Sequence, residues 1–228
     1  MPRSEFDDFA SSYGDAVNSS IRFSGMSVDH FVRGKARHLE AILSASGISS
    51  DDGILDIGCG IGQYEKLLGD RYDMVGMDMS KASIEEAAAT VSSAKLVHYE
   101  GATFPFGDAT FQVAFAICVV HHVPLGERIL LIDEVRRVLR PGGLFLVYEH
   151  NPWNPLTRWA VERCVFDKDA ILISQPATRR WLEGNGFADV QSEFLFNLPP
   201  SSDMLLRLDR WARRIPAGAR YVTWGCKA

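Results

Sequence analysis

Short hydrophobic runs alternate with longer stretches of mixed polarity from about residue 50 onward. The runs are rich in Ile, Val and Phe and show little polar alternation, which is typical of strands that are buried on both faces. The pattern therefore predicts an α/β fold built on a doubly wound parallel sheet with helices on both sides. The expected strands cover residues 54–57, 74–77, 95–99, 111–119, 144–149, 187–196 and 219–226.

Helices are expected between these strands and ahead of the first one. Residues 80–92 open with an N-capping Ser80 and carry glutamates in the early turns, as the start of a helix usually does. Residues 125–139 end in arginines, which suit the negative end of a helix dipole. Further helices are expected within the first fifty residues, above all over 32–43, and over 156–164 and 176–184. In the helix over 32–43 the basic residues Arg33, Lys35 and Arg37 are expected on the side that faces solvent.

Composition narrows the class of protein. The chain of 228 residues is 46% hydrophobic and 23% charged, which is typical of a globular domain and excludes a disordered chain. Its longest unbroken apolar run, Val113–Val120, has 8 residues, whereas a membrane-spanning helix needs about 20. Acidic residues close to the N-terminus argue against a leader peptide, so a cytoplasmic protein is expected. A net charge of −5 without a basic block argues against a nucleic-acid partner.

The spacing of cysteines and histidines does not indicate a metal site. The four cysteines are scattered without a Cys-x-x-Cys pair, so they are expected to be reduced thiols. The histidines show no metal-ligand spacing either, and the side chains of the neighbours His121 and His122 are expected to diverge. No metal is therefore expected.

The most informative segment is a glycine-rich turn that follows the first expected strand. Residues 54–62 read Ile-Leu-Asp-Ile-Gly-Cys-Gly-Ile-Gly, and glycine is needed where the backbone takes a positive φ or lies against a ligand. Asp78 ends the second expected strand. In a doubly wound sheet an acid at that place accepts the two hydroxyls of a ribose. The combination predicts a nucleoside-binding site.

The details of this turn favour one kind of nucleoside. A dinucleotide site has the spacing Gly-x-Gly-x-x-Gly, but Gln63 stands where the third glycine would be. Asp56 precedes the turn, and a carboxylate there repels a pyrophosphate but attracts an ammonium group. A cationic nucleoside without phosphate is therefore favoured, and S-adenosylmethionine is the obvious candidate.

These segments resemble the motifs of the class I S-adenosylmethionine-dependent methyltransferases of the small-molecule type. Residues 55–62 match the first motif of that family, and residues 76–80 are similar to its second-strand acid with the neighbour that packs on adenine. Residues 100–106, 111–123 and 137–143 are similar to later motifs. The resemblance extends over about residues 30–150 and is specific for the cofactor rather than for the acceptor.

The resemblance implies a fold and a set of cofactor contacts. The expected fold is a single Rossmann-like methyltransferase domain over residues 1–228, with a seven-stranded sheet in the order 3-2-1-4-5-7-6 and strand 7 antiparallel. Residues 1–50 are expected to form a helical lid over the cofactor, although the aromatic residues around Tyr13 fit an ordinary apolar stripe equally well. The residues expected to bind S-adenosylmethionine are Tyr13, Asp56, Gly58, Cys59, Gly60, Gly62, Asp78, Met79, Glu100, Gly101, Ala102 and Cys118.

The acceptor is expected beyond the carboxyl ends of the fourth and fifth strands, where sites of such sheets lie. Methyl transfer requires an acceptor held in line, and a hydroxyl acceptor also requires a base. His150 is the leading candidate base, with Glu149 or His122 orienting it; a structural role under the cofactor loop stays open for His121 and His122. Residues 151–185 are expected to be an acceptor-side insertion, in which Trp153 and Asn151 contact the acceptor or form a rigid connector.

A basic amphipathic helix is expected over residues 201–216, with an apolar stripe from Met204 to Ile215 and arginines elsewhere. Such a helix usually caps the sheet; weak contact with a membrane surface is the alternative.

The leading hypothesis for function is methyl transfer from S-adenosylmethionine to a small-molecule acceptor at oxygen, with nitrogen and carbon acceptors open. The alternatives are a binding or regulatory protein of the same fold without catalysis, and a nucleotide-dependent oxidoreductase. Monomer and homodimer stay open.

Overall fold

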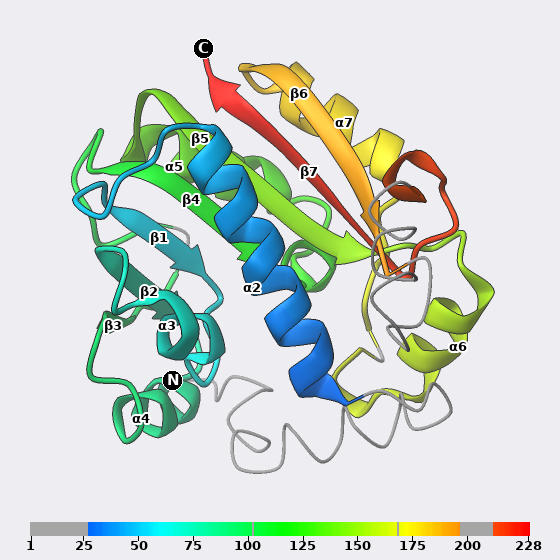
Figure 1. Cartoon of the computed structure of the whole chain (residues 1–228), viewed down its shortest axis with the longest axis horizontal. Helices are drawn as coiled ribbons and strands as arrows, with labels where there is room; N and C mark the ends of the chain where they lie inside the picture. Colours follow the sequence, from blue (N-terminus) through cyan, green and yellow to red (C-terminus); the bar gives the residue numbers. More distant parts are fainter. Residues whose placement is uncertain (1–26, 102, 168, 197–211) are drawn as a thin grey trace.

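The computed structural model describes residues 27–101, 103–167, 169–196 and 212–228. Its centre is a seven-stranded sheet in the order β3-β2-β1-β4-β5-β7-β6 (Figure 1). Strands β3, β2, β1, β4 and β5 pair in parallel, whereas β7 is antiparallel to both β5 and β6. The predicted strand order and the antiparallel seventh strand are confirmed. The bounds are β1 Ile54–Ile57, β2 Met74–Asp78, β3 Lys95–His98, β4 Phe111–Ile117, β5 Leu139–His150, β6 Phe187–Leu195 and β7 Arg220–Lys227.

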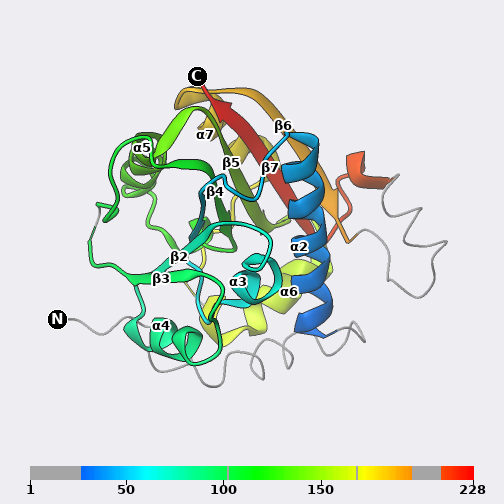
Figure 2. The same ribbon diagram turned by 60° about the vertical axis from the view of Figure 1, so that its left-hand side comes forward.

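Helices cover both faces of the sheet (Figures 1 and 2). Helix α2 crosses one face and packs with α3, while α5 and α7 lie on the opposite face. The α-helices are α2 Val28–Ala45, α3 Gln63–Leu68, α4 Lys81–Ala88, α5 Arg128–Val138, α6 Pro155–Arg163 and α7 Gln175–Gly184. Short 3₁₀ turns are η4 Val120–His122, η5 Val165–Asp167 and η6 Ala212–Arg214.

Strand β4 shows why its sequence lacks polar alternation. Val113 and Phe115 belong to the hydrophobic cluster under α2, whereas Ala114 and Ala116 belong to the cluster under α5 and α7. Successive side chains point to opposite faces of a strand, so a central strand between two helical layers needs apolar residues at every position. Because β1 pairs in parallel with both β2 and β4, the carboxyl ends of these three strands lie side by side at the same end of the sheet.

Helix α2 is fixed to the sheet by polar contacts as well as by its apolar side. His38 is buried, with Nδ1 3.0 Å from the Tyr148 hydroxyl of β5 and Nε2 2.9 Å from a Glu193 oxygen of β6. Lys35 is also buried, at 7% exposure, although the sequence pattern placed it on the polar side of the helix with Arg33 and Arg37. Carboxyl groups of Glu149 and Asp56 lie near its ammonium group and favour its charge.

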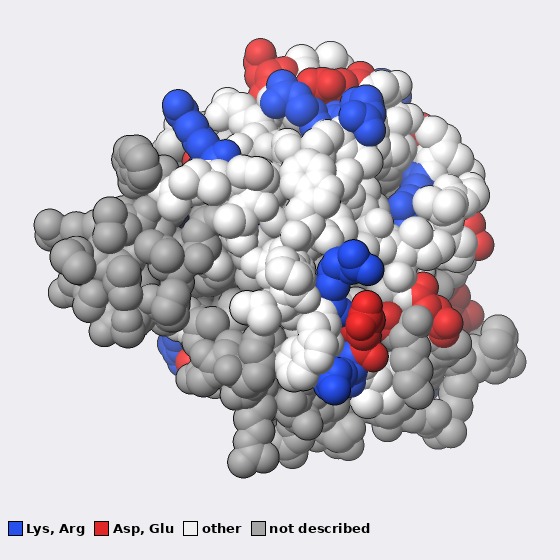
Figure 3. Space-filling model, turned by 90° about the vertical axis from the view of Figure 1, so that its right-hand side faces the viewer, with Lys and Arg blue, Asp and Glu red and all other residues white. Residues whose placement is uncertain are grey.

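Several expectations concern segments outside the described residues. Tyr13 and the first 26 residues of the expected lid are among them, as are Ala102 and the greater part of the expected basic helix. The described end of that helix, Ala212–Arg214, is a 3₁₀ turn. None of the helices that the structure describes combines the length and hydrophobicity that a membrane span requires. Among the described atoms of the face in Figure 3, acidic and basic side chains are interspersed rather than gathered into one basic surface.

Replacing Phe115 by alanine is expected to lower the free energy of unfolding by about 3–5 kcal/mol, because the ring is fully buried and its loss leaves a cavity. Urea denaturation of the wild type and the variant measures this change. Ile129→Ala is the matched control, since Ile129 is 48% exposed and its truncation should change stability by less than about 0.5 kcal/mol. Equal effects of the two substitutions would contradict the assignment of β4 to the core.

Candidate active site

The glycine-rich turn connects β1 to α3, and part of its backbone is not covered by other atoms. Gly58, Gly60 and Gly62 have φ angles of 74°, 54° and 74°, which L-residues with a side chain rarely adopt. A Cβ at Gly58 would lie 2.5 Å from a Val119 methyl carbon, and one at Gly62 would lie 2.7 Å from a Val91 methyl carbon. A Cβ at Gly60 would meet nothing within 4 Å. Gly58 and Gly62 are thus required for packing, whereas the backbone at Gly60 is open to a ligand.

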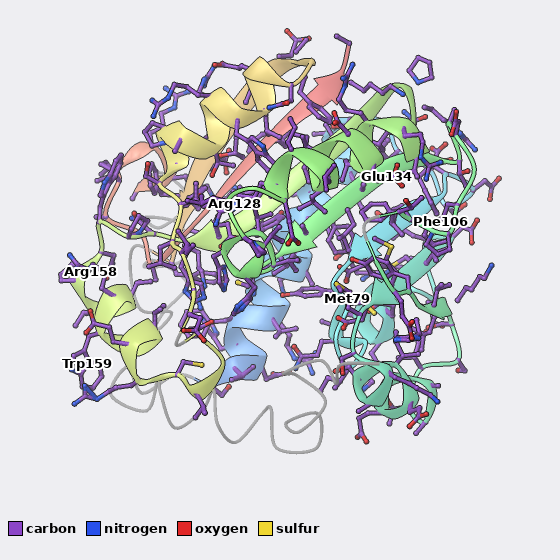
Figure 4. All side chains as sticks on the ribbon, turned by 180° about the vertical axis from the view of Figure 1, so that it is seen from behind. Met79, Phe106, Arg128, Glu134, Arg158 and Trp159 are labelled. Atoms are coloured by element: carbon purple, nitrogen blue, oxygen red, sulfur yellow. The ribbon has the colours of Figure 1, made fainter. Side chains whose placement is uncertain are left out.

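Asp78 lies against this turn, as the sequence predicted. Its Oδ2 accepts a hydrogen bond from the Gly60 backbone N–H at 2.9 Å, and its Oδ1 accepts one from the Ser80 N–H at 2.8 Å. The carboxylate is therefore held at the end of β2 next to the open backbone. Met79 follows it with 54% exposure and is labelled in Figure 4. Glu100 and Gly101 follow β3 at the same edge and are exposed.

Two carboxyl groups are buried beneath the turn. Asp56 of β1 and Glu65 of α3 are 1% and 0% exposed, and Asp56 Oδ2 and both Glu65 oxygens lack a hydrogen-bond donor among the described residues. Burial and the charges of Glu65 and Asp78 raise the pKa of Asp56 well above its ordinary value. Burial also raises the pKa of Glu65 to about 7. Burial of the two carboxyl groups therefore favours a protonated form of the pair.

Lys35 brings a buried cation to the same region. Its Nζ lies 4.0 Å from Cys118 Sγ and 5.7 Å from the centre of the Tyr64 ring. Burial lowers the pKa of Lys35, while the negative charges of Glu149 and Asp56 and the Cys118 thiol oppose that change. Cys118 ends β4 with a φ of 60°. Lys35 thus stands between the glycine-rich turn and the carboxyl end of β5.

The carboxyl end of β5 carries a buried ion pair. Glu149 is 0% exposed and His121 is 1% exposed. His121 donates its backbone N–H to Glu149 Oε1 at 3.2 Å, and its Nδ1 bonds Glu149 Oε2. Burial disfavours a charged imidazole, but the charge of Glu149 and the hydrogen bonds with Asp167 and Glu149 raise the pKa of His121 to about 10. The same contacts hold the pKa of Glu149 below its ordinary value against the opposing effect of burial.

His121 and His122 both reach Asp167 of η5. His121 Nε2 lies 3.3 Å and His122 Nε2 lies 3.4 Å from Asp167 Oδ1, and the two rings are 4.1 Å apart. The expectation that these neighbouring side chains diverge is therefore wrong. The tight turn η4 and a single carboxylate in front of it bring both imidazoles to one point.

His150 completes the cluster at the end of β5. Its ring lies 5.0 Å from that of His121, and its Nδ1 contacts the guanidinium of Arg220. Burial and the Arg220 charge lower the pKa of His150 well below its ordinary value, so the imidazole is neutral. The three residues expected to be catalytic, His150, His122 and Glu149, thus lie around His121 and Asp167.

The segment after β5 has a structural role at its first residue. Asn151 is fully buried and donates its amide to the carbonyl oxygens of Pro216 and Gly218 at 3.1 and 2.8 Å. These bonds favour the rigid-connector interpretation for Asn151. Trp153 is 53% exposed, and its ring lies 6.4 Å from that of Phe194, so it remains accessible from outside.

Some residues of the site were not expected from the sequence. Glu65 and Asp167 lie in helical turns whose local sequence has no motif, and only their tertiary contacts show their place. The sequence pattern does not distinguish Lys35 from Arg33 and Arg37, which lie on the same helix. Only the structure separates them, because Lys35 is buried and the two arginines are exposed.

Glu65→Gln is expected to remove a pH dependence of stability. The folded state keeps a proton on the buried pair between the ordinary Glu pKa of 4.5 and about 7, whereas the unfolded chain loses it, so wild-type stability falls as pH rises through this window. The amide of the variant cannot titrate, so its stability should not fall in this window. As the pH rises, the unfolding free energy of the variant should therefore increase relative to that of the wild type by an amount on the order of 3 kcal/mol. Urea denaturation between about pH 5 and about pH 8 measures it.

The control for this substitution is Glu85→Gln, which changes an exposed glutamate of α4. Its stability should follow that of the wild type at every pH. Parallel profiles for Glu65→Gln and the wild type would show that the buried pair does not hold the proton.

Comparison with known proteins agrees with this geometry. A family model described as a methyltransferase domain matches residues 55–147. The chain is 32% identical to a sterol 24-C-methyltransferase of Eremothecium gossypii over 147 residues, which cover 60% of this chain and 38% of that protein. It is also 32% identical to an uncharacterized methyltransferase of Synechocystis sp. over 132 residues, which cover 55% of this chain and 62% of that protein. The chain thus spans less than two thirds of the length of each of these relatives.

A solved structure extends the likeness over nearly the whole fold. The SAM-dependent methyltransferase of Thermotoga maritima, described as a possible histamine N-methyltransferase, superposes with a TM-score of 0.71 at 18% identity and covers 98% of both chains. At this identity the likeness concerns the fold. The family match identifies residues 55–147 as a methyltransferase domain. The turn that carries Asp56, Gly60 and Asp78 lies in this domain, and the chain as a whole has the fold of a SAM-dependent methyltransferase.

Proposed function

We propose that this chain transfers a methyl group from S-adenosylmethionine to an oxygen atom of a small-molecule acceptor. The observation that carries the proposal is the open backbone at Gly60 next to the fixed Asp78 carboxylate, with the acidic pair Asp56 and Glu65 beneath it. The bound cofactor supplies a methyl group on a positively charged sulfur, which makes that carbon electrophilic.

The residues present fit this cofactor. Asp78 is suited to the ribose hydroxyls, because its two oxygens lie at the open end of β2. Asp56 is suited to an ammonium group, because its Oδ2 is buried and lacks a donor among the described residues. Lys35 is suited to a carboxylate at the same place. The full proposed set is Asp56, Gly58, Cys59, Gly60, Gly62, Asp78, Met79, Glu100, Gly101 and Cys118, with Tyr13 and Ala102 outside the described residues.

The acceptor half supports oxygen as the atom methylated. A hydroxyl acceptor must lose a proton, and imidazoles and carboxylates gather where β4 and β5 end. We propose His150 and His122 as the groups that contact the acceptor, and Glu149 as the residue that positions His121. His122 has the more exposed side chain, at 22% against complete burial of the His121 side chain. The Eremothecium relative is a sterol 24-C-methyltransferase, which methylates carbon, so carbon is the competing acceptor atom.

Calorimetric titration with S-adenosylmethionine and S-adenosylhomocysteine tests the cofactor assignment. Both should bind with micromolar affinity, and NAD should not bind, because Asp56 opposes a pyrophosphate and the third glycine of a dinucleotide site is missing. Asp78→Asn should weaken binding at least about tenfold, since it removes the charged acceptor at the ribose position. Asp73→Asn, just before β2, should bind like the wild type.

Failure of the wild type to bind either adenosyl compound would overturn the proposal. Binding without turnover on any acceptor would instead favour a binding or regulatory protein of this fold.

His150→Ala is expected to lower kcat by about a hundredfold or more while leaving the affinity for S-adenosylmethionine within about threefold, because the imidazole lies on the acceptor side of Lys35. The measurement is steady-state turnover on an acceptor found by screening, together with calorimetry of the cofactor. An equal loss of cofactor affinity and turnover would place His150 in the cofactor site instead.

A further inference from the structure

We propose that His121, His150 and Asp167, with His122 beside them, form a binding site for a divalent transition-metal ion of the zinc or iron class, at the acceptor end of the sheet. One ligand atom each from His121, His150 and Asp167 lies within 4.8 Å of the others. Imidazole nitrogens with one carboxylate oxygen are the donors that Zn²⁺ and Fe²⁺ prefer in proteins. Sequence spacing predicted no metal site, because these residues come from three separate segments of the chain.

The ligand spacing fits a bound ion. Zinc–nitrogen and zinc–oxygen bonds are about 2.0–2.1 Å long, so neighbouring ligand atoms of a tetrahedral ion lie about 3.3–3.4 Å apart. The distances from Asp167 Oδ1 to His121 Nε2 and His122 Nε2 are 3.3 and 3.4 Å. These distances exceed the usual length of a strong charged hydrogen bond, which is about 2.7–2.9 Å. The two distances are thus compatible with ligand atoms around one ion, in addition to the hydrogen bond that His121 makes in its absence.

Glu149 is the carboxylate partner that a metal-binding histidine normally has on its second ring nitrogen. Its carboxylate holds Nδ1 of His121, which directs Nε2 toward Asp167. A carboxylate behind a histidine fixes the ring and its tautomer for metal binding in many sites. Glu149 and Asp167 also place two carboxylates against the His121 ring, and a divalent cation would replace the imidazolium proton that compensates them.

Arg220 is the one residue whose contact opposes this arrangement. Its guanidinium lies against Nδ1 of His150, and a guanidinium has only N–H donors. It therefore competes, as a cation, for a nitrogen lone pair of that imidazole. Removal of Arg220 is expected to strengthen metal binding, whereas it would not strengthen a cluster held together by protons alone.

An ion has a route to the site from the surface. A cavity of about 350 Å³ is lined by Arg158, Val161, Glu162, Asp167, Ala170 and Leu172. Figure 4 shows Arg158 and Trp159 on α6 at the outer side of this end of the molecule. Asp167 thus belongs both to the cluster and to a cavity beside α6.

The role of the ion rests on the proposed function. A bound divalent metal lowers the pKa of an oxygen ligand and holds it in place. An acceptor with a hydroxyl group, alone or beside a second oxygen, would therefore bind through that oxygen. This assigns the acceptor to a class of metal-binding oxygen compounds.

Metal binding is tested directly on the full chain after dialysis against a chelator. Titration with Zn²⁺ and with Co²⁺ should show one ion per chain, and Co²⁺ should give the visible absorption of a tetrahedral site. Asp167→Asn and His122→Ala should each weaken binding at least about tenfold, and Arg220→Met should tighten it. The matched controls are Asp133→Asn, an exposed carboxylate of α5, and His30→Ala, a histidine of α2 outside the cluster.

The outcomes separate the site from the methyltransferase function. Stoichiometric binding that the cluster variants lose and the controls keep supports the site, whether or not S-adenosylmethionine binds in a parallel titration. Absence of stoichiometric metal in the folded wild type, or equal binding by Asp167→Asn, overturns it. Circular dichroism of each variant verifies folding, and His122→Ala, which alters the most exposed imidazole of the cluster, keeps the test decisive where Asp167→Asn unfolds.

Discussion

The burial of one carboxylate organises the acceptor end of the sheet. Glu149 is fully buried at the end of β5, and an ionised carboxylate without a partner there would cost several kcal/mol. His121 supplies that partner through its backbone N–H and its ring. The pairing fixes the turn after β4 against the end of β5, and everything that follows in the chain is arranged around it.

The segment after α6 depends on the same pair. The carbonyl oxygen of His121 accepts a hydrogen bond from the Ile171 N–H at 2.9 Å. Arg128 of α5, labelled in Figure 4, donates to the carbonyl oxygens of Val123 and Ile171, both at 3.0 Å. These bonds hold η5 where Asp167 meets the two histidines. The segment around η5 has little apolar sequence pattern. It is positioned by polar contacts to His121 and Arg128, and His121 is in turn held by Glu149.

The sequence indicated the glycine-rich turn and its neighbouring acid because both are local features. The turn from Gly58 to Gly62 and the acid Asp78 are fixed by backbone conformation and by two strands that pair directly. Hydrophobic runs located the strands, since the central ones are apolar on both faces. The strand order was implied by the resemblance to a family, because neither periodicity nor composition determines which strands become neighbours.

The sequence predicted less of the acceptor half of the site. His122 and His150 were named as candidates because they follow strands, but the carboxylate between them lies in η5, and its sequence neighbourhood shows no motif. Lys35 was grouped with two solvent-facing residues, because a helical period alone does not show that a cation is needed inside. Such residues are defined by charges brought close through long-range contacts, which a pattern of polar and apolar positions does not record.

The distribution of these charges explains the choice of cofactor better than any single motif. Asp78 and the pair Asp56 and Glu65 make the glycine-rich turn acidic, and Lys35 is the nearest buried cation. A pyrophosphate at Gly60 would meet Asp78 directly, because the Gly60 N–H that would bind it already donates to that carboxylate. A nucleoside that carries positive charge and a single carboxylate suits both the acidic turn and Lys35. The acid before the turn therefore follows from the charge of the ligand that the turn suits.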